Sequence, residues 1–429
     1  MKLLKLAFCC IFFVSAASPH QSFTSIDPFW NFFDTYPYDE ALHPTETTAC
    51  KAALGSPGWP TDEDWANYNI SIGGRLIKTS PPGAIANATS AEHIKISLVF
   101  ARRYNIRVVV KSSGHDFQGR STAPGALSIW VHHMQAIETR SAPFRPQACP
   151  VTINEKTGGG STFGVMTSVT MLAYPSPPMM AALLSISSPK LGTDWFWDMV
   201  GYILSQFPYL DSSGLSGYSF MNLHYANRSK PKTDIWTGGF VLLDTDDSAK
   251  MLAIWEPIFE HIRNTWPEAE IATPITAAFP SYLDYFHVAH DKGYAGLDLY
   301  AGSRLLDADS LAADSSALGQ AFKVMSATYG TAFLVTGSGT RNAKPRGGSN
   351  AISHAYRRSI AYATTGLLFE PLNVTAREEA LRRVNNVLEP LKKLSPGMGA
   401  YVNEYLCSQL SPGEISAIPN EMQSWLLVT

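Results

Sequence analysis

The stretch from Arg107 to Ser121 limits what this chain can fold into more than any other part of the sequence. It opens with the β-branched run Val108–Val110, which predicts a short buried strand. Ser112–Gly114 follow at once, and they let the backbone bend tightly so that successive N–H groups point toward one place. Such a loop suits a pyrophosphate because it offers hydrogen-bond donors without side-chain bulk. His115 would stand beside the bound group.

A strand that ends in a glycine and a histidine also occurs in ordinary surface turns, so this loop alone is a weak motif. Its continuation makes it specific. From Arg107 to Met134 the sequence closely resembles the flavin-attachment loop of the fungal FAD-linked oxidoreductases with a PCMH-type FAD domain, the berberine-bridge-enzyme-like group. The likeness includes Ser128-Ile129-Trp130 and His132-His133. It implies FAD as the cofactor, bonded covalently through His115.

The resemblance also implies which other residues meet FAD. The attachment loop would contribute Lys111, Ser112, Ser113, Gly114, His115 and Asp116. A glycine run at Gly158, Gly159 and Gly160 resembles a late element of the FAD domain and would approach the cofactor closely. Tyr401 and Asn403 lie in a Gly-Ala-Tyr-x-Asn-Glu element whose Tyr and Asn face the flavin, which makes them the candidate catalytic residues. A further family element ends at Tyr356-Arg357, with Tyr356 in place of Trp.

Periodicity predicts an α+β fold. Thr89 and Glu92 form a capping box that starts a helix leading into the strand at 108–110, and a second strand is expected at Leu127–Val131. The apolar face of this helix is expected to carry Ile94, Leu98 and Ala101. Another helix is expected to start near Thr61. Later in the chain, strands are expected at 240–243 and 332–335 and helices at 249–262 and 376–394. This pattern is typical of an antiparallel sheet covered by helices.

These elements indicate a PCMH-type FAD-binding domain and a substrate domain. The expected segments are a signal peptide at 1–17, a lead segment at 18–54, the FAD domain at 55–175, the substrate domain at 176–398, and a return to the FAD domain with a divergent tail at 399–429. Against the family pattern, much of the FAD domain is missing between Ile153 and Thr157. The likeness also stops after Tyr405. We therefore interpret the FAD domain as incomplete.

The N-terminus predicts secretion. Lys2 and Lys5 precede a short apolar run, Leu6–Val14, and Ser15–Ala17 supply small residues for cleavage. Four glycosylation sequons agree with this route: those of Asn69, Asn87, Asn227 and Asn373. Related proteins carry a disulfide where Cys50 and Cys149 stand, which implies that bond here and leaves Cys407 unexplained.

Composition and spacing argue against other classes. The net charge of −3 and the pI near 6.4 do not suit a nucleic-acid partner. No later segment is long and apolar enough for a membrane span. His132 and His133 are adjacent on an extended strand and so face opposite ways, which disfavours a shared metal. Thr336–Thr340 lacks the full nucleophile-elbow spacing of a serine hydrolase.

The sequence therefore predicts an FAD-dependent oxidoreductase that oxidises a small organic molecule, with dioxygen as the electron acceptor. The resemblance is strongest to enzymes of fungal secondary metabolism, with the chanoclavine-I synthases of ergot-alkaloid pathways as one candidate group. In those pathways the FAD-linked enzyme acts together with a partner enzyme. Two alternatives stay open: a truncated, catalytically inactive family member, and a secreted binding protein that reuses the substrate domain.

Overall fold

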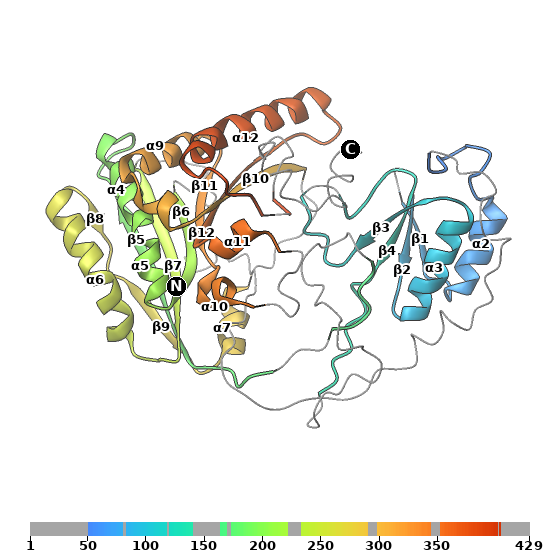
Figure 1. Ribbon diagram of the computed structural model, residues 1–429, viewed down its shortest axis with the longest axis horizontal. Helices are drawn as coiled ribbons and strands as arrows, with labels where there is room; N and C mark the ends of the chain where they lie inside the picture. Colours follow the sequence, from blue (N-terminus) through green and yellow to red (C-terminus); the bar gives the residue numbers. More distant parts are fainter. Residues whose placement is uncertain are drawn as a thin grey trace. The chain divides into compact units, whose positions relative to one another are not determined.

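The computed structural model describes residues 50–79, 83–117, 120–139, 164–169, 173–221, 233–290, 298–344, 352–401 and 403–404. Within these ranges the chain forms two compact units that divide between Ala173 and Tyr174. This division lies next to the boundary expected after residue 175. We describe each unit by itself (Figure 1).

The smaller unit is a four-stranded sheet with two helices. Its strands are β1 (Leu76–Thr79), β2 (Gly83–Asn87), β3 (Arg107–Lys111) and β4 (Ala126–Trp130), in the spatial order β1-β2-β4-β3. β1 pairs antiparallel with β2, whereas β2 and β3 both run parallel to β4. The helices are α2 (Asp62–Ser71) and α3 (Ala91–Arg103). The structure thus confirms both predicted strands and the helix between residue 89 and the first strand.

Aromatic packing joins the two helices of the smaller unit. Tyr68 of α2 stacks on Phe100 of α3 with 4.3 Å between ring centroids, and Trp65 meets the same ring at 4.9 Å. α2 begins as expected, because the Thr61 side chain accepts a hydrogen bond from the Asp64 N–H and the Asp64 carboxylate accepts one from the Thr61 N–H. This reciprocal cap satisfies N–H groups that a helix start leaves open.

Two details of α3 differ from the prediction. Ser90, not Thr89, is the N-cap, because its hydroxyl accepts the hydrogen bond from the His93 N–H. Leu98 is 42% exposed, whereas Ser97 and Phe100 are buried beside Ile94 and Ala101. The buried face is therefore rotated by one residue, because the Ser97 hydroxyl pairs with the Tyr68 hydroxyl and draws that side of the helix inward.

The larger unit is built on an eight-stranded sheet with the order β10-β12-β11-β6-β7-β5-β8, and β9 also pairs with β5. All the pairings along it are antiparallel, as predicted. The strands are β5 (Met179–Ser187), β6 (Leu215–Met221), β7 (Ile235–Leu243), β8 (Glu270–Ile271), β9 (Ile275–Phe279), β10 (Leu299–Leu306), β11 (Gly330–Leu334) and β12 (Ala361–Leu368).

Helices flank both faces of this sheet. They are α4 (Asp194–Ser205), α5 (Phe207–Ser212), α6 (Ser248–Thr265), α7 (Tyr282–Ala289), α8 (Ala308–Ala312), α9 (Ser315–Met325), α10 (Gly337–Asn342), α11 (His354–Arg358) and α12 (Val374–Leu394). Buried residues of α4, α6, α9 and α12 form one core with the inward side chains of the strands, and Figure 1 shows these helices on one side of the sheet. The predicted helices at 249–262 and 376–394 correspond to α6 and α12. Leu252 is only half-buried, while Met251 takes the inward place beside Trp255.

The segment after α12 differs from the expected domain plan. The prediction assigned residues 399–429 to a return into the FAD domain. Of these, residues 399–401, 403 and 404 are described, and they lie in the larger unit. The Gly399 carbonyl accepts a hydrogen bond from the Leu305 N–H, and the Tyr401 N–H donates to the Ser303 hydroxyl at 3.0 Å. Pairing with β10 therefore holds this segment on the larger sheet.

Candidate functional site

The predicted pyrophosphate loop lies at the carboxyl end of β3, where parallel strands usually present ligand-binding loops. β4 anchors it. The Val131 N–H donates to the Lys111 carbonyl at 2.8 Å, and the Trp130 indole N–H donates to the Ser112 carbonyl at 2.9 Å. The Lys111 ammonium lies 5.1 Å from the centroid of the Trp130 ring, a cation–π distance. The loop therefore leaves the sheet in a fixed direction.

The loop forms an open cradle of backbone donors. Across the described parts of the chain, none of the N–H groups of residues 112–116 donates a hydrogen bond to another group. Gly114 has φ +92°, and a Cβ atom there would lie 2.9 Å from Lys111 Cε. A side chain at this position would be strained and would fill the cradle. Ser112, Ser113 and His115 are exposed, so the donors and the imidazole are accessible from solution.

An ion pair closes the far end of the loop. Asp116 is largely buried and accepts from the Arg120 backbone N–H at 2.7 Å and from two guanidinium nitrogens, with the shorter distance at 2.6 Å. Paired in this way, Asp116 serves to hold the loop's shape. Among the predicted loop residues at 111–116, Asp116 is the one that forms an ion pair within the described residues. This ion pair fixes the turn after His115.

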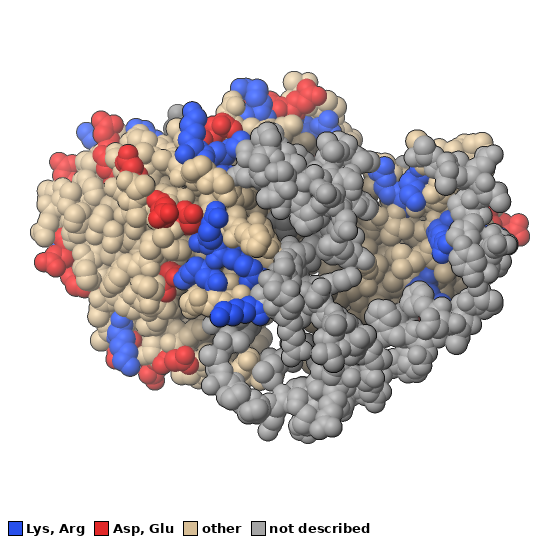
Figure 2. All heavy atoms as spheres, in the orientation of Figure 1, with Lys and Arg blue, Asp and Glu red and all other residues tan. Residues whose placement is uncertain are grey.

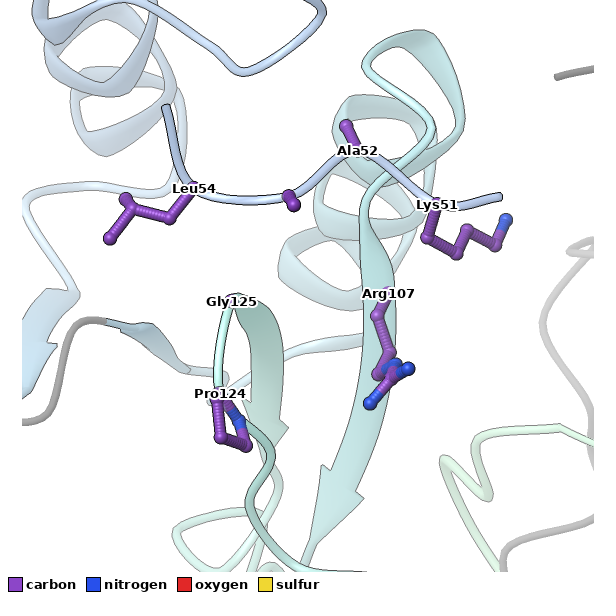
Figure 3. Close-up of a pocket in the computed structure, with 7 residues that line it drawn as sticks. Lys51, Ala52, Leu54, Arg107, Pro124 and Gly125 are labelled. Carbon is purple, nitrogen blue, oxygen red and sulfur yellow. The ribbon is translucent and has the colours of Figure 1, made fainter. Parts of the chain in front are cut away.

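A hollow of about 370 Å³ lies at the opposite end of the same sheet (Figure 3). Its lining residues are Lys51, Ala52, Ala53, Leu54, Arg107, Pro124 and Gly125. β3 begins at Arg107 and β4 begins immediately after Gly125, so the hollow sits at the amino ends of these strands. Figure 3 shows Lys51, Ala52 and Leu54 along one side of the hollow, and Arg107, Pro124 and Gly125 along the other. The hollow is therefore separate from the loop at residues 112–116.

In the larger unit, Tyr401 and Asn403 lie over the sheet face that the core helices leave uncovered. Alternate residues of four strands point to this face. Most are aromatic or carry a hydroxyl: Tyr218, Phe220, Ser303, Thr331, Phe333, Tyr362 and Thr364. The Phe333 ring packs against Tyr218 at 4.8 Å and Tyr362 at 5.0 Å between centroids. Phe333, Tyr362 and Thr364 are buried on this second face of the sheet, so the face is a packed cluster of aromatic and hydroxyl side chains.

Tyr401 and Asn403 contact each other directly. The Asn403 amide donates to the Tyr401 hydroxyl at 3.0 Å, and the Tyr401 ring lies 5.9 Å from the Tyr362 ring. Tyr356 belongs to the same group, because the nearby Tyr401 phenol adds to the effect of burial in raising the pKa of Tyr356. The structure thus brings two predicted site residues and the unusual Tyr356 together in one cluster.

Positive charge gathers beside this cluster. α10 carries Arg341, and α11 carries Arg357 and Arg358. Figure 2 shows a group of Lys and Arg side chains over the place where α10 and α11 lie in Figure 1. Arg341 is paired with the buried carboxylate of Asp211. The edge of this second sheet face near α11 is therefore positively charged, whereas the described strand residues on the face are uncharged.

Comparison with known proteins follows this geometry. No protein-family model matches the sequence. The FAD-linked oxidoreductase apf9 of Gibberella fujikuroi is 23% identical, over 83% of this chain and 87% of the relative. The bifunctional decalin synthase calF of Penicillium decumbens is 22% identical over 84% and 87%. The crystal structure of the VAO-type flavoprotein MtVAO713 from Myceliophthora thermophila superposes with a TM-score of 0.71 at 18% identity, over 88% of this chain and 94% of that one. The chain is similar to fungal FAD-linked oxidoreductases over most of its length.

Its fold is that of the VAO-type flavoproteins, as the resemblance of the loop had implied. The loop at Gly114 is compatible with FAD: N–H donors that have no partner among the described residues suit a pyrophosphate, and the φ of +92° at Gly114 favours a residue without a Cβ. Val165 packs against Ala88, Ile94 and Ile129, which places residues 164–169 beside β2, α3 and β4.

Several predicted residues lie outside the described residues: Gly158, Gly159, Gly160, Cys149 and Asn227. Cys50 is exposed. Among the other sequon residues, Asn373 is exposed and caps α12, and the Asn69 side-chain oxygen accepts a hydrogen bond from the Leu76 N–H. Asn87 is half-buried, with its side-chain oxygen 2.7 Å from His133 Nδ1. Within the ranges that the structure describes, no helix is both long and apolar enough to cross a membrane.

Sequence reasoning gave no role to Glu404, the last residue of the Tyr401–Glu404 element. The structure buries its Oε2 atom, which has no hydrogen-bond partner among the described residues. Burial raises the pKa of this carboxyl to about 7, and a hydrogen bond with the Thr364 side chain offsets a smaller part of that effect. The sequence signal for this site was the family element itself, which ends in a carboxylate.

Proposed function

We propose that this chain is an FAD-dependent oxidoreductase that oxidises a small organic molecule, with dioxygen as the electron acceptor. The observation that carries the proposal is the cradle of open backbone donors at residues 112–116, at the carboxyl end of β3 in a VAO-type fold. Lys111 to Gly114 would hold the pyrophosphate there. When bound, FAD would supply the capacity to take a hydride from a substrate carbon.

His115 would attach the flavin covalently. The side chain is exposed at the turn where the loop bends, next to Gly114. The Asp116–Arg120 pair fixes the chain on the other side of His115. The imidazole is thus carried by backbone that is held at both ends. This arrangement suits a residue that must meet a cofactor atom in one orientation.

Tyr401 and Asn403 would act on the substrate side. The Asn403 amide donates to the Tyr401 oxygen, so the phenol is oriented and its own proton can be given to another acceptor. Around it, the partly buried rings of Tyr218 and Phe220 would contact an apolar substrate body. The cationic edge at α11 favours a substrate with an anionic group on that side.

The biological setting is proposed from the relatives. One of them is named a decalin synthase and others FAD-linked oxidoreductases of fungi, which supports a role in fungal secondary metabolism. Alkaloid biosynthesis is proposed from the sequence resemblance alone. A partner enzyme of the same pathway is part of this proposal. So is entry into the secretory pathway, which rests on the N-terminal sequence and the sequons.

The main alternative is a family member without activity. The alignment with the Gibberella fujikuroi protein runs over 521 positions, more than the 429 residues of this chain, although it covers 83% of it. The relative therefore carries internal segments that have no counterpart here. This observation supports an internal deletion in general, and its position between Ile153 and Thr157 is proposed from the sequence resemblance alone.

Flavin retention tests the proposal. The full chain is expressed, loaded with FAD and precipitated with acid. Flavin that has bound should stay yellow in the pellet, and His115→Ala should release it into the supernatant. His132→Ala is the matched control, since this exposed histidine stacks on Trp130 outside the loop. Release of flavin from the wild-type protein would refute covalent attachment, and the absence of any bound flavin would refute the oxidoreductase.

A further inference from the structure

Glu404 lies beside β12, where its carboxyl bonds to the Thr364 side chain. Its backbone N–H donates to the Tyr401 carbonyl at 2.9 Å, which closes a turn over residues 401–404. The Tyr401 N–H in turn donates to the Ser303 hydroxyl on β10. On β12, Thr364 is the cross-strand partner of Ser303 and bonds to the Glu404 carboxyl. The side chain of Glu404 thus ties the turn that carries Tyr401 and Asn403 to the strand beneath it.

The Thr364 hydroxyl has one proton and two acceptors nearby. It lies 3.2 Å from the Gly302 carbonyl and also bonds to Glu404. If Glu404 is neutral, its O–H can donate to the Thr364 oxygen while Thr364 donates to Gly302, so both hydroxyl protons have an acceptor. If Glu404 is ionised, it can only accept, and Thr364 must abandon the Gly302 carbonyl to serve it. The hydrogen-bond pattern therefore favours the protonated acid.

The charges around Glu404 favour the same form. The titratable groups packed on this side are phenols: Tyr401 on the same turn, Tyr362 on β12 and Tyr356 on α11. The nearby arginines are engaged elsewhere. Arg304 of β10 donates to Ser395, and Arg358 of α11 donates to the Gly397 carbonyl. Among the described residues, no cation contributes to the pKa of Glu404, which burial raises. An ionised Glu404 would be a buried charge without a counter-ion.

The geometry points to Glu404 as a positioning residue of the proposed active site, one that holds the Tyr401–Asn403 pair in place only while its own carboxyl group carries a proton. Loss of the proton would leave a buried anion under the turn and loosen residues 401–404 from β12. Tyr401 and Asn403 would lose their fixed orientation over the second face of the sheet. The site would therefore be competent at acidic to neutral pH and would lose order as the pH rises through about 7.

The first test measures stability and needs no flavin. A folded pKa of about 7 exceeds the ordinary 4.5 of a glutamate, so the stabilising effect of neutral Glu404 is complete below 4.5 and is lost between 4.5 and 7. Wild type and Glu404→Gln should melt at similar temperatures at pH 4.5, and the variant should become progressively more stable relative to wild type up to pH 7.5. The control is Glu389→Gln, an exposed carboxylate paired with Lys392 on α12. Parallel wild-type and Glu404→Gln curves would overturn the inference.

The second test rests on the proposed function. In the FAD-loaded enzyme, kcat/KM of the wild type should fall above pH 7, whereas Glu404→Gln should keep its activity with a flat profile there. Glu404→Ala should lower kcat/KM at every pH, because it removes the link to Thr364. Identical pH profiles for wild type and Glu404→Gln would exclude a positioning role in catalysis. If no variant turns over but the melting curves diverge as expected, the proposed function is wrong, and the structural role of protonated Glu404 is still supported.

Discussion

At the scale of single residues, Trp130 supports the cofactor loop in two ways. Its indole N–H binds the Ser112 carbonyl, and its ring lies under the Lys111 ammonium. Trp130→Phe would keep an aromatic face for Lys111 and remove the hydrogen bond. A hydrogen bond of this kind is worth about 0.5–1.5 kcal/mol, so FAD affinity should fall about two- to tenfold. Fluorescence titration measures this. Trp195→Phe, which removes an exposed indole bond to Glu268, should leave FAD affinity unchanged, and a similar loss in both variants would argue against a role for the loop anchor.

The same scale shows where sequence reasoning stops. Gly114 and His115 were identified by their type and spacing, because a tight loop after a strand needs a glycine with positive φ. Tyr401 and Asn403 came from family resemblance alone. The role of Glu404 was out of reach, since its burial depends on Thr364 of β12, forty residues earlier in the chain. No local sequence pattern predicts the contact between Glu404 and Thr364.

At the scale of elements, α4 and α9 cross at two glycines. A Cβ atom on Gly319 would collide with the Trp197 carbonyl oxygen, and one on Gly201 would collide with the Ser315 carbonyl oxygen. These contacts involve backbone, so neither helix can yield by a rotamer change. Gly319→Ala should destabilise the protein by about 1–3 kcal/mol in chemical denaturation, despite the higher helix propensity of alanine. Gly164→Ala, where a Cβ atom meets open space, is the control. A neutral or stabilising Gly319→Ala would mean that the helices do not pack this closely.

Periodicity predicted the long elements well and their details less well. α6, α12, β7 and β11 were expected because their apolar spacing spans several turns or alternations. The start of α3 was misplaced by one residue because Thr89 and Ser90 are both good caps, and the choice falls to the one whose hydroxyl reaches the His93 N–H. Leu98 was predicted to be buried. The spacing of apolar residues in α3 does not show which of two adjacent rows of side chains packs against Tyr68.

At the scale of the whole molecule, two sequence segments of the proposed flavin site resemble the family clearly. The sequence between these two segments resembles the family less. The loop after β3 and the Tyr401–Glu404 turn are both in place within their own units. Between them lies the proposed internal deletion from Ile153 to Thr157. A cofactor as large as FAD needs a wall along its length as well as donors at the pyrophosphate.

We therefore expect this chain to bind FAD at low occupancy, and a version that carries the missing segment from a full-length relative to bind it fully. The graft would be inserted between Ile153 and Thr157, with the rest of the chain unchanged. Flavin absorbance per protein measures occupancy, and peroxide production with dioxygen measures turnover. A graft of equal length rich in Gly and Ser controls for the insertion itself, since it restores distance without a binding surface. Full flavin content in the unaltered chain, matched by equal peroxide production, would show that the present 429 residues already form a complete oxidase and that the proposed deletion removes nothing the cofactor needs.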